Sequence, residues 1–163
     1  MYSLSDSLPY LLNRLGVRLG NLFGQRIAPL GVTVSMHRVL ATLLERSDLK
    51  LNELSSVTTI ELSTMSRLIG KMVADGLVTR GRAPNDDRAV HINLTEQGRK
   101  IAEQTRELAE HYDIVAGGVL RPAELKELKR ILVRMYDATD VLEEELADVP
   151  EEKRVSSKAA IAR

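Results

Sequence analysis

Basic side chains gather in the middle of this sequence and acidic ones near its end. Between residues 67 and 82 the sequence has one acidic residue, Asp75, and four basic residues: Arg67, Lys71, Arg80 and Arg82. Between residues 143 and 152 every charged residue is an acid. Because Lys plus Arg equals Asp plus Glu, 23 each, the formal net charge is zero. The uneven placement favours a basic surface for phosphate groups, although either run could instead be a solvated face.

No group of residues has the spacing of a catalytic or metal site. The three histidines, His37, His91 and His111, are scattered, unlike metal ligands. The sequence contains no glycine-rich phosphate loop and no Gly-x-Ser-x-Gly element. It contains no Cys, which excludes disulfides, thiolate metal sites and thiol-based redox sensing. We therefore expect a protein that is not an enzyme and that has no cofactor and no metal.

The elements that must position these side chains are mainly helical. Apolar residues recur at helical spacing and aromatic residues make up only 3% of the chain. We expect six helices: residues 6–28, capped by Ser5 or Asp6; a second capped by Thr33; a short third after Leu49; a fourth over about 61–75; a fifth from Thr95 to about Ala116; and a sixth opened by Pro122. The stretch 55–59 is expected to form a turn.

A β-hairpin is expected between the fourth and fifth helices. Val90, Ile92 and Leu94 alternate with polar residues, which is the pattern of a half-buried strand, and residues 77–80 supply its partner. Residues 81–89 favour turns and predict a long charged tip. Helices followed by such a hairpin make a mainly α fold with a small β wing, the winged helix-turn-helix.

In a winged helix-turn-helix the fourth helix enters the major groove of DNA. Its core side is expected to be Met65, Leu68, Ile69, Met72 and Val73. Its outward side is then Glu61, Ser63, Thr64, Arg67 and Lys71. Side chains of the first turn could contact base edges or phosphates. Arg67 could contact a guanine or a phosphate, and Lys71 could contact the DNA backbone. Taken alone, the same side chains could be ordinary solvated residues.

The hairpin tip offers a second contact with DNA. Asp86 and Arg88 are two residues apart, so the carboxylate could orient the guanidinium for the narrow minor groove. The alternative is a surface ion pair contributing ~0–1 kcal/mol. Arg82 is expected to meet a phosphate.

Five segments in this order and spacing resemble the MarR family of bacterial and archaeal regulators: Leu30-Gly31-Val32-Thr33, Ser63-Thr64-Met65-Ser66-Arg67, Gly76-Leu77-Val78, Asp86-Asp87-Arg88 and Leu94-Thr95-Glu96-Gln97-Gly98. The resemblance covers about residues 6–146. No segment is specific alone, but the five together are. The resemblance implies an intertwined homodimer that binds a palindromic operator in double-stranded DNA and represses nearby genes.

The resemblance also implies a small-molecule effector, an aromatic acid or its coenzyme A thioester, that releases the DNA. The family's cleft lies between the dimer helices and the DNA-binding lobe, where Arg14, Arg18 and His37 could line it. An arginine there would bind a carboxylate through two hydrogen bonds. Alternatively, the two arginines form salt bridges across the dimer and His37 is a packed helix residue.

The expected organisation assigns dimerisation to residues 6–30 and 118–147, DNA binding to 31–116, and a flexible tail to 148–163. The sixth helix carries a seam spaced alternately by three and four residues: Leu125, Leu128, Leu132, Met135, Thr139, Leu142 and Leu146. A partner helix or packing within the chain could cover it. We expect no membrane partner and a cytoplasmic, nucleoid-associated location. The rival hypothesis is a winged-helix protein–protein adaptor that does not bind DNA.

Overall fold

The structure is a computed structural model that describes residues 3–83 and 86–147, apart from the side chains of 82, 83, 86–89, 143, 146 and 147. The predicted tail, 148–163, lies outside the described residues. The chain divides into two compact units, Met1–Val115 and Ala116–Arg163. In chain order the elements are η1 (Leu4–Asp6), α1 (Leu8–Ile27), η2 (Ala28–Leu30), α2 (Val34–Glu45), β1 (Leu49–Lys50), α3 (Leu51–Thr58), α4 (Leu62–Ala74), β2 (Val78–Ala83), β3 (Asp86–Leu94), α5 (Glu96–Gly117), α6 (Pro122–Asp137) and α7 (Asp140–Ala147).

The mainly helical fold with a small antiparallel wing is confirmed, but the start of α1 and the end of α3 differ from the prediction. Ser7, with an extended backbone, is the N-cap of α1, so the predicted caps Ser5 and Asp6 are wrong; both lie in η1. Thr33 caps α2 as predicted, because its Oγ1 accepts a hydrogen bond from the Met36 N–H at 3.2 Å.

The predicted turn over residues 55–59 is also wrong, because α3 continues through Thr58. Hydroxyl residues often favour turns because they compete for backbone groups. Here the Thr58 hydroxyl instead donates to the Leu54 carbonyl at 2.6 Å, one turn back along the same helix. The chain turns only at Thr59, whose φ of 55° is in the left-handed region.

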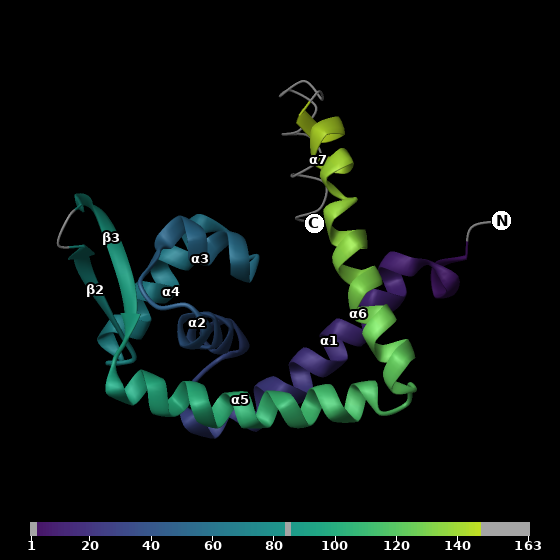
Figure 1. Ribbon diagram of the computed structural model, residues 1–163, viewed down its shortest axis with the longest axis horizontal. Helices are drawn as coiled ribbons and strands as arrows, with labels where there is room; N and C mark the ends of the chain where they lie inside the picture. Colours follow the sequence, from purple (N-terminus) through teal and green to yellow (C-terminus); the bar gives the residue numbers. More distant parts are fainter. Residues whose placement is uncertain (1–2, 84–85, 148–163) are drawn as a thin grey trace, which may run out of the picture. The chain divides into compact units, whose positions relative to one another are not determined.

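The sheet has three antiparallel strands in the order β1–β3–β2; Figure 1 labels β2 and β3, which form the hairpin. The sequence did not predict β1, because two residues are too few to show alternation. Leu49 of β1 pairs with Ile92 of β3, so the segment before α3 is tied to the root of the hairpin. β1 therefore attaches the β3 side of the hairpin to the segment before α3.

The arms of the hairpin are longer than predicted. Ala83 pairs with Asp86, so most of the expected tip over 81–89 belongs to β2 and β3. The register shifts next to this pair, since Arg82 pairs with Val90. Residues 87–89 thus form a bulge on β3.

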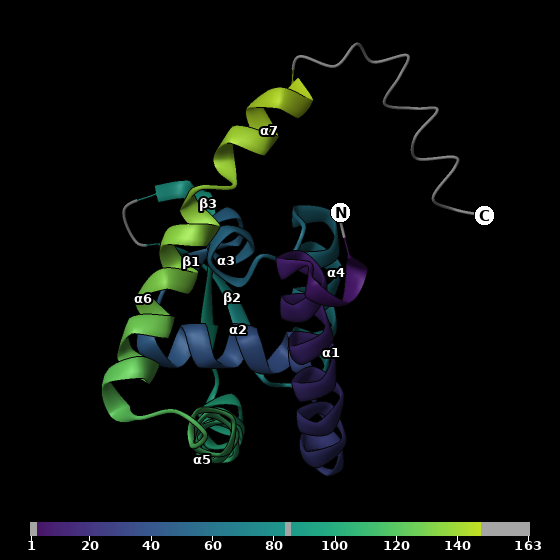
Figure 2. The same ribbon diagram turned by 90° about the vertical axis from the view of Figure 1, so that its right-hand side faces the viewer.

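The lobe closes around an apolar core supplied by α1 to α5 and the root of the hairpin. Its fully buried side chains include Ile27, Met36, Leu40, Leu54, Met65, Ile69, Met72, Val78 and Ile92. Figures 1 and 2 show α2, α3 and α4 packed beside the hairpin, with α5 running below α2.

The junction from β3 to α5 is fixed by Thr95 and Gly98. Thr95 Oγ1 accepts from the Gly98 N–H at 2.9 Å and donates to the Gly76 carbonyl at 2.6 Å. A Cβ at Gly98 would lie 1.8 Å from the Leu77 carbonyl oxygen. Gly98 therefore permits a close approach that no other residue allows, which accounts for one of the segments that resembles the MarR family.

In the second unit the predicted sixth helix is interrupted and forms α6 and α7. The break falls at Thr139, the polar member of the seam, whose hydroxyl donates to the Tyr136 carbonyl at 2.7 Å. The Thr139 N–H donates to the same carbonyl at 3.0 Å. Both donors thus tighten the chain around Tyr136 and end the regular ladder.

Among the described residues, no single helix has the length and hydropathy to span a membrane. Only the bent pair Leu8–Leu30 and Val34–Glu45, which meet at 78°, satisfies those criteria when the two are taken together.

Candidate DNA-binding surface and neighbouring pocket

Helix α4 has one buried and one exposed face, as predicted for a recognition helix. Met65, Ile69 and Met72 are fully buried. The opposite face exposes Ser63, Thr64, Arg67 and Lys71. One detail of the prediction is wrong: Val73 was expected in the core, but its side chain is 39% exposed.

Glu61 is the N-cap of α4, a role that the sequence analysis did not give it. Its carboxylate accepts hydrogen bonds from the Ser63 N–H at 3.1 Å and the Thr64 N–H at 3.2 Å. It also accepts from the Ser63 hydroxyl and, at 3.3 Å, from the Thr64 hydroxyl. These bonds, the Ser63 hydroxyl first, lower the pKa of Glu61 to about 2. The side chain is exposed, but its carboxylate oxygens already accept hydrogen bonds from Ser63 and Thr64, and it stays ionised at neutral pH.

The two cations of α4 differ in their surroundings. Lys71 Nζ lies 2.9 Å from Asp75 Oδ2, one turn on along the same helix. This exposed pair is weak, but it reduces the net positive charge at that end. Arg67 lies one turn closer to the helix start and is exposed. Of the two, Arg67 is the better placed to bring charge to a ligand along the first two turns.

A third cation, Arg80, was not among the predicted site residues. Its Nη2 donates to the Ser66 carbonyl at 3.1 Å, so an arginine of strand β2 is bonded to the backbone of α4. The hairpin and the recognition helix are thereby tied together. The sequence placed Arg80 in a basic group, but it did not predict the hydrogen bond from Arg80 to the Ser66 carbonyl.

A polar cluster of Asp48, His91 and Asn93, here called the wing latch, fixes the other side of the hairpin. Asn93 Oδ1 accepts from the Asp48 N–H and Asn93 Nδ2 donates to Asp48 Oδ1, both at 2.8 Å. His91 Nδ1 lies 3.0 Å from Asp48 Oδ2 and from the Asp48 carbonyl oxygen. Asp48 has a φ of 63°, a conformation that Asp tolerates better than most residues. The latch holds β3 to the loop before α3.

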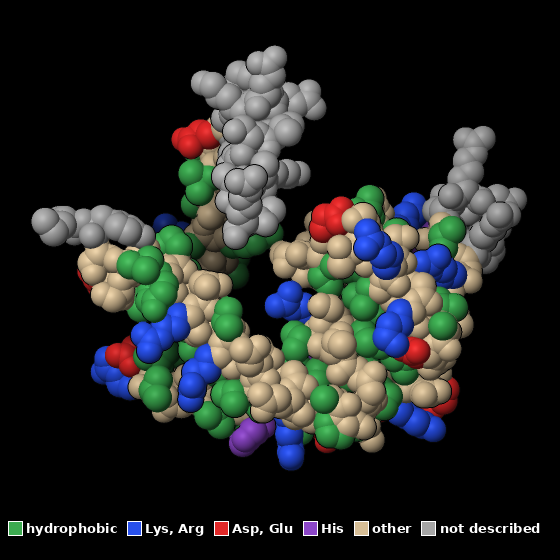
Figure 3. Space-filling model, turned by 180° about the vertical axis from the view of Figure 1, so that it is seen from behind, with side chains coloured by type: hydrophobic (Ala, Val, Ile, Leu, Met, Phe, Trp, Pro, Cys, Tyr) green, Lys and Arg blue, Asp and Glu red, His purple; other side chains and the backbone are tan. Residues whose placement is uncertain are grey.

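The predicted wing residues Arg82, Asp86 and Arg88 have side chains outside the described residues. Their backbones place Arg82 on β2, Asp86 at the start of β3 and Arg88 within the bulge. Their contacts with DNA stay predictions. Figure 3 shows the lobe from behind, with several Lys and Arg side chains on the part next to the hairpin.

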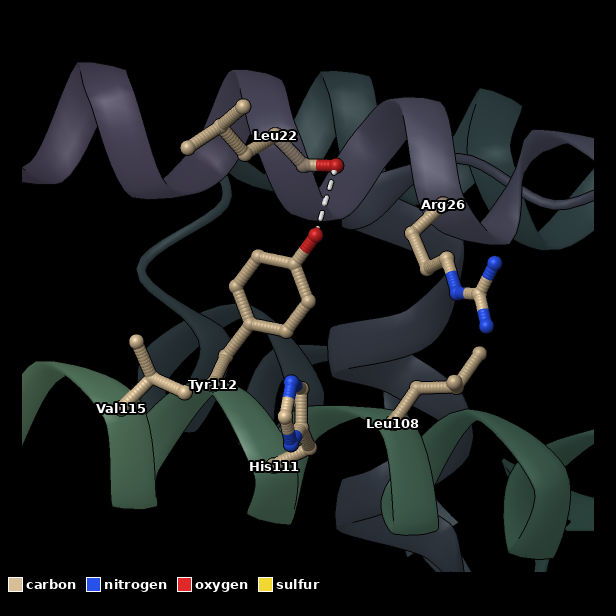
Figure 4. A pocket seen from close by; sticks show the side chains of 6 residues that line it. All are labelled: Leu22, Arg26, Leu108, His111, Tyr112 and Val115. Atoms are coloured by element: carbon tan, nitrogen blue, oxygen red, sulfur yellow. Dashed lines mark hydrogen bonds between the residues drawn. The ribbon is translucent and has the colours of Figure 1, made fainter.

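A pocket of about 510 Å³ lies between α1 and α5 (Figure 4). Leu22 and Arg26 of α1 face four residues of α5, which are Leu108, His111, Tyr112 and Val115. The Tyr112 hydroxyl donates to the Leu22 carbonyl at 3.1 Å and bridges the two helices. The walls are largely apolar, with one guanidinium among them. Such a lining suits a small aromatic molecule that carries a negative charge.

The predicted effector residues lie elsewhere. Arg14 and Arg18 are exposed on α1, about three and two turns before Arg26 respectively, and they do not line this pocket. His37 packs edge-on against Phe23, with ring centroids 4.7 Å apart, which is the packed-residue alternative. It also borders further cavities of about 460 and 370 Å³.

Burial, and then the charge of Arg38, lower the pKa of His37. The imidazole is therefore uncharged at neutral pH and is not suited to neutralise a carboxylate. Effector roles for Arg14, Arg18 and His37 stay predictions. Among the residues that the structure describes, no three His, Asp or Glu side chains are grouped to hold a metal ion.

Comparison with known proteins places this geometry in one family. Residues 30–89, which span α2 to most of the hairpin, match the model of the MarR family. The transcriptional repressor IacR of Pseudomonas putida is 26% identical over 133 residues, which are 82% of this chain and 80% of IacR.

Two solved structures share the fold over most of the chain. Bordetella bronchiseptica BpsR, described with regulation of its DNA binding by 6-hydroxynicotinic acid, is 28% identical with a TM-score of 0.76, covering 84% of this chain and 98% of BpsR. A mutant MarR of Escherichia coli in complex with operator DNA is 26% identical with a TM-score of 0.71, covering 78% of this chain and 92% of that MarR chain. Over most of its length the chain is therefore similar to the MarR family of winged helix-turn-helix transcriptional regulators.

Proposed function

We propose that this regulator is a repressor that binds a palindromic operator as a homodimer and releases it when a small aromatic carboxylic acid binds. The observation that carries the DNA-binding role is the exposed polar face of α4, which Arg80 ties to the hairpin. The wing latch ties the same hairpin to the loop before α3. Support for operator binding comes from the likeness to an E. coli MarR seen with operator DNA. Support for repression comes from the name of IacR.

Homodimerisation rests on the exposed apolar side chains of α1 and α6, which are here called the outer helices. Leu8, Leu11, Leu12 and Leu15 of α1 are each more than 40% exposed, and none of the residues of α6 is buried. Exposed apolar area of this extent marks an interaction surface. A second copy brings two recognition helices to one duplex, and the two half-sites of a palindrome then match the twofold symmetry of the protein.

The test of DNA binding is a selection of binding sites from random duplexes, followed by a titration at two salt concentrations. Phosphate contacts release counterions, so affinity should fall steeply with added salt. The Arg67→Ala variant should lose ~1–3 kcal/mol of affinity if Arg67 reads a base, and should then tolerate a new base pair at one position. If Arg67 meets only phosphate, all sequences should weaken alike and the salt slope should fall by about one. Absence of any selected sequence would favour the adaptor hypothesis.

The effector is assigned to the pocket at Arg26. A small aromatic carboxylate can place its ring among Leu22, Leu108 and Val115 and its charge on the guanidinium. The regulation of BpsR by 6-hydroxynicotinic acid supports this ligand class. The coenzyme A thioesters belong in the same screen as a second ligand class, since a thioester lacks the carboxylate and would not need Arg26.

The effector test is release of operator DNA by candidate acids from the wild type, Arg26→Ala and Arg14→Ala. We expect Arg26→Ala to need at least about tenfold more acid, because it loses a charge-assisted bond, while Arg14→Ala behaves as wild type. Linkage requires that DNA weakens acid binding by the same factor as the acid weakens DNA binding. Equal release from all three proteins would place the acid outside this pocket.

A further inference from the structure

The start of the recognition helix carries an unusual concentration of internal hydrogen bonds. Four donors converge on the carboxylate of Glu61: the N–H groups and the hydroxyls of Ser63 and Thr64. All three side chains are exposed on the face of α4 that is free of the core. The pattern is therefore on the surface that the proposed function turns toward the major groove.

These bonds decide what the two hydroxyls can offer to a ligand. An ionised carboxylate only accepts hydrogen bonds, so each hydroxyl must donate to it, and a hydroxyl has one proton and two lone pairs. With the proton of each committed to Glu61, Ser63 and Thr64 present lone pairs outward. The pKa of about 2 for Glu61 means that its carboxylate is ionised at neutral pH.

The same bonds disfavour phosphate at the helix start. A helix N-terminus normally binds anions through its unpaired N–H groups. Here the N–H groups of Ser63 and Thr64 are taken, and the negative charge of Glu61 lies beside them. A phosphate placed at Ser63 and Thr64 would find these two N–H groups occupied and the negative charge of Glu61 beside it. The partner must instead be a hydrogen-bond donor.

We propose that Ser63 and Thr64 select, by accepting hydrogen bonds, the exocyclic amino group of adenine or cytosine in the major groove, with Glu61 as the residue that fixes this polarity. These amino groups are the donors that the major groove displays, whereas guanine and thymine present acceptors there. The inference rests on the proposed function, because it requires α4 to enter the groove. It narrows the open choice between bases and phosphates for the first turn.

The first test uses base analogues in the half-site that the wild type selects. Replacing one adenine by 2-aminopurine moves its amino group to the minor groove, and pyrimidin-2-one in place of cytosine removes the amino group. We expect one such change per half-site to weaken wild-type binding by about two- to tenfold, the range for a single neutral hydrogen bond. The variant Ser63→Ala, Thr64→Val should bind the altered and unaltered half-sites equally.

The second test separates the polarity from the fold of the helix. Asn is as good an N-cap as Asp, so Glu61→Asn keeps a cap but removes the carboxylate that holds the hydroxyl protons. Its melting temperature and far-ultraviolet circular dichroism should confirm an intact α4. Binding-site selection with this variant should show a guanine or thymine newly tolerated at the position that responded to the analogue.

The outcomes distinguish this inference from the proposed function. If the wild type selects no sequence at all, the proposed function fails and this inference with it. If the wild type binds its operator tightly but tolerates every analogue, this inference alone is overturned. It is also overturned if Ser63→Ala, Thr64→Val weakens all sequences equally and lowers the salt slope by about one per half-site, because that is the behaviour of a phosphate contact.

Discussion

The DNA-binding lobe and the outer helices α1 and α6 place their apolar residues in opposite ways. In α4, Met65, Ile69 and Met72 are fully buried, and their neighbours from α2, α3 and the hairpin bury them without any second chain. In α1, Leu11 and Leu15 are 43% and 55% exposed, and in α6, Leu128 is 41% exposed. The side chains of α4 are therefore buried within one chain, whereas α1 and α6 expose apolar side chains that the proposed dimer would cover.

The largest expected effect comes from charging the outer surface. The double variant Leu128→Lys, Leu132→Lys leaves little to disturb within an isolated chain, since both side chains are at least 37% exposed. In a dimer it buries unpaired charges, which is costly. Light scattering of the wild type should give about 36 kDa, twice the chain mass of 18.1 kDa. The variant should be monomeric or aggregated.

The control for this prediction is Val133→Lys, which adds one lysine beside the seam, where the double variant adds two within it, at a residue that is 62% exposed. It should remain a dimer. A wild type of about 18 kDa at micromolar concentration would show that the outer helices need no second copy.

A matched pair of truncations sharpens the comparison. Ile69→Ala removes a fully buried side chain of the lobe and should cost 2–5 kcal/mol at any protein concentration. Leu11→Ala removes a half-exposed side chain of α1, so its cost, about 1 kcal/mol, should appear mainly as weaker dimerisation. Urea unfolding at two protein concentrations separates them, because only Leu11→Ala should raise the dependence of the midpoint on concentration. If the urea midpoints of Ile69→Ala and Leu11→Ala depended on protein concentration in the same way, the lobe and the outer helices would not differ in their need for a partner.

The lobe holds its wing with the polar bonds of the latch in addition to the buried apolar root of the hairpin, and removing the latch should cost about 1 kcal/mol. Asp48→Gly deletes the side chain that meets His91 and Asn93, and Gly accepts the φ of 63° without strain. Operator affinity should fall about tenfold while the protein remains a dimer. Asp48→Asn, which tolerates the same backbone, should lose less. Unchanged affinity for Asp48→Gly would mean that the hairpin needs no latch.

The sequence predicted what periodicity and strong local signals determine. It placed six helices, the Thr33 cap, the end of α4 before Gly76 and the alternation of β3. It failed where the partner of a side chain is distant or is a backbone group: the bond of Arg80 to the Ser66 carbonyl, and the latch, whose Asp48 lies 45 residues from Asn93. No pattern of residue types encodes such pairs.

The candidate site divides in the same way. The exposed face of α4 followed from its period of 3.6, but the capping role of Glu61 did not, because an acid at a helix start can equally be a solvated residue. The pocket at Arg26 was missed since it depends on how α1 and α5 pack. The resemblance to the MarR family implied a cleft lined by Arg14, Arg18 and His37, and these roles stay predictions.

The charge of Glu61 should make the lobe sensitive to acid. The lowered pKa, about 2 against a usual 4.5, means that the ionised carboxylate stabilises the folded state. This contribution is fully present above about pH 4.5 and is lost as the pH falls toward 2. The melting temperature of Glu61→Gln should therefore lie below that of the wild type at pH 7, and the gap should narrow as the pH falls below 4.5. A gap that does not depend on pH would mean that the carboxylate adds no charge-dependent stability.

The smallest expected effect concerns the break between α6 and α7. The Thr139 hydroxyl occupies the Tyr136 carbonyl, and Thr is a poorer helix former than Leu by up to about 0.5 kcal/mol. Thr139→Leu removes the competing donor and completes the apolar seam, so it should join α6 to α7 and strengthen dimerisation. Circular dichroism should show added helix, and sedimentation a dissociation constant lowered by about twofold. The isosteric control Thr139→Val removes the hydroxyl but keeps the β-branch, so a gain in helix seen only with Leu would assign the break to the poor helix propensity of Thr139 rather than to its hydrogen bond. The lobe, which does not depend on this seam, should melt unchanged in the monomeric Leu128→Lys, Leu132→Lys background.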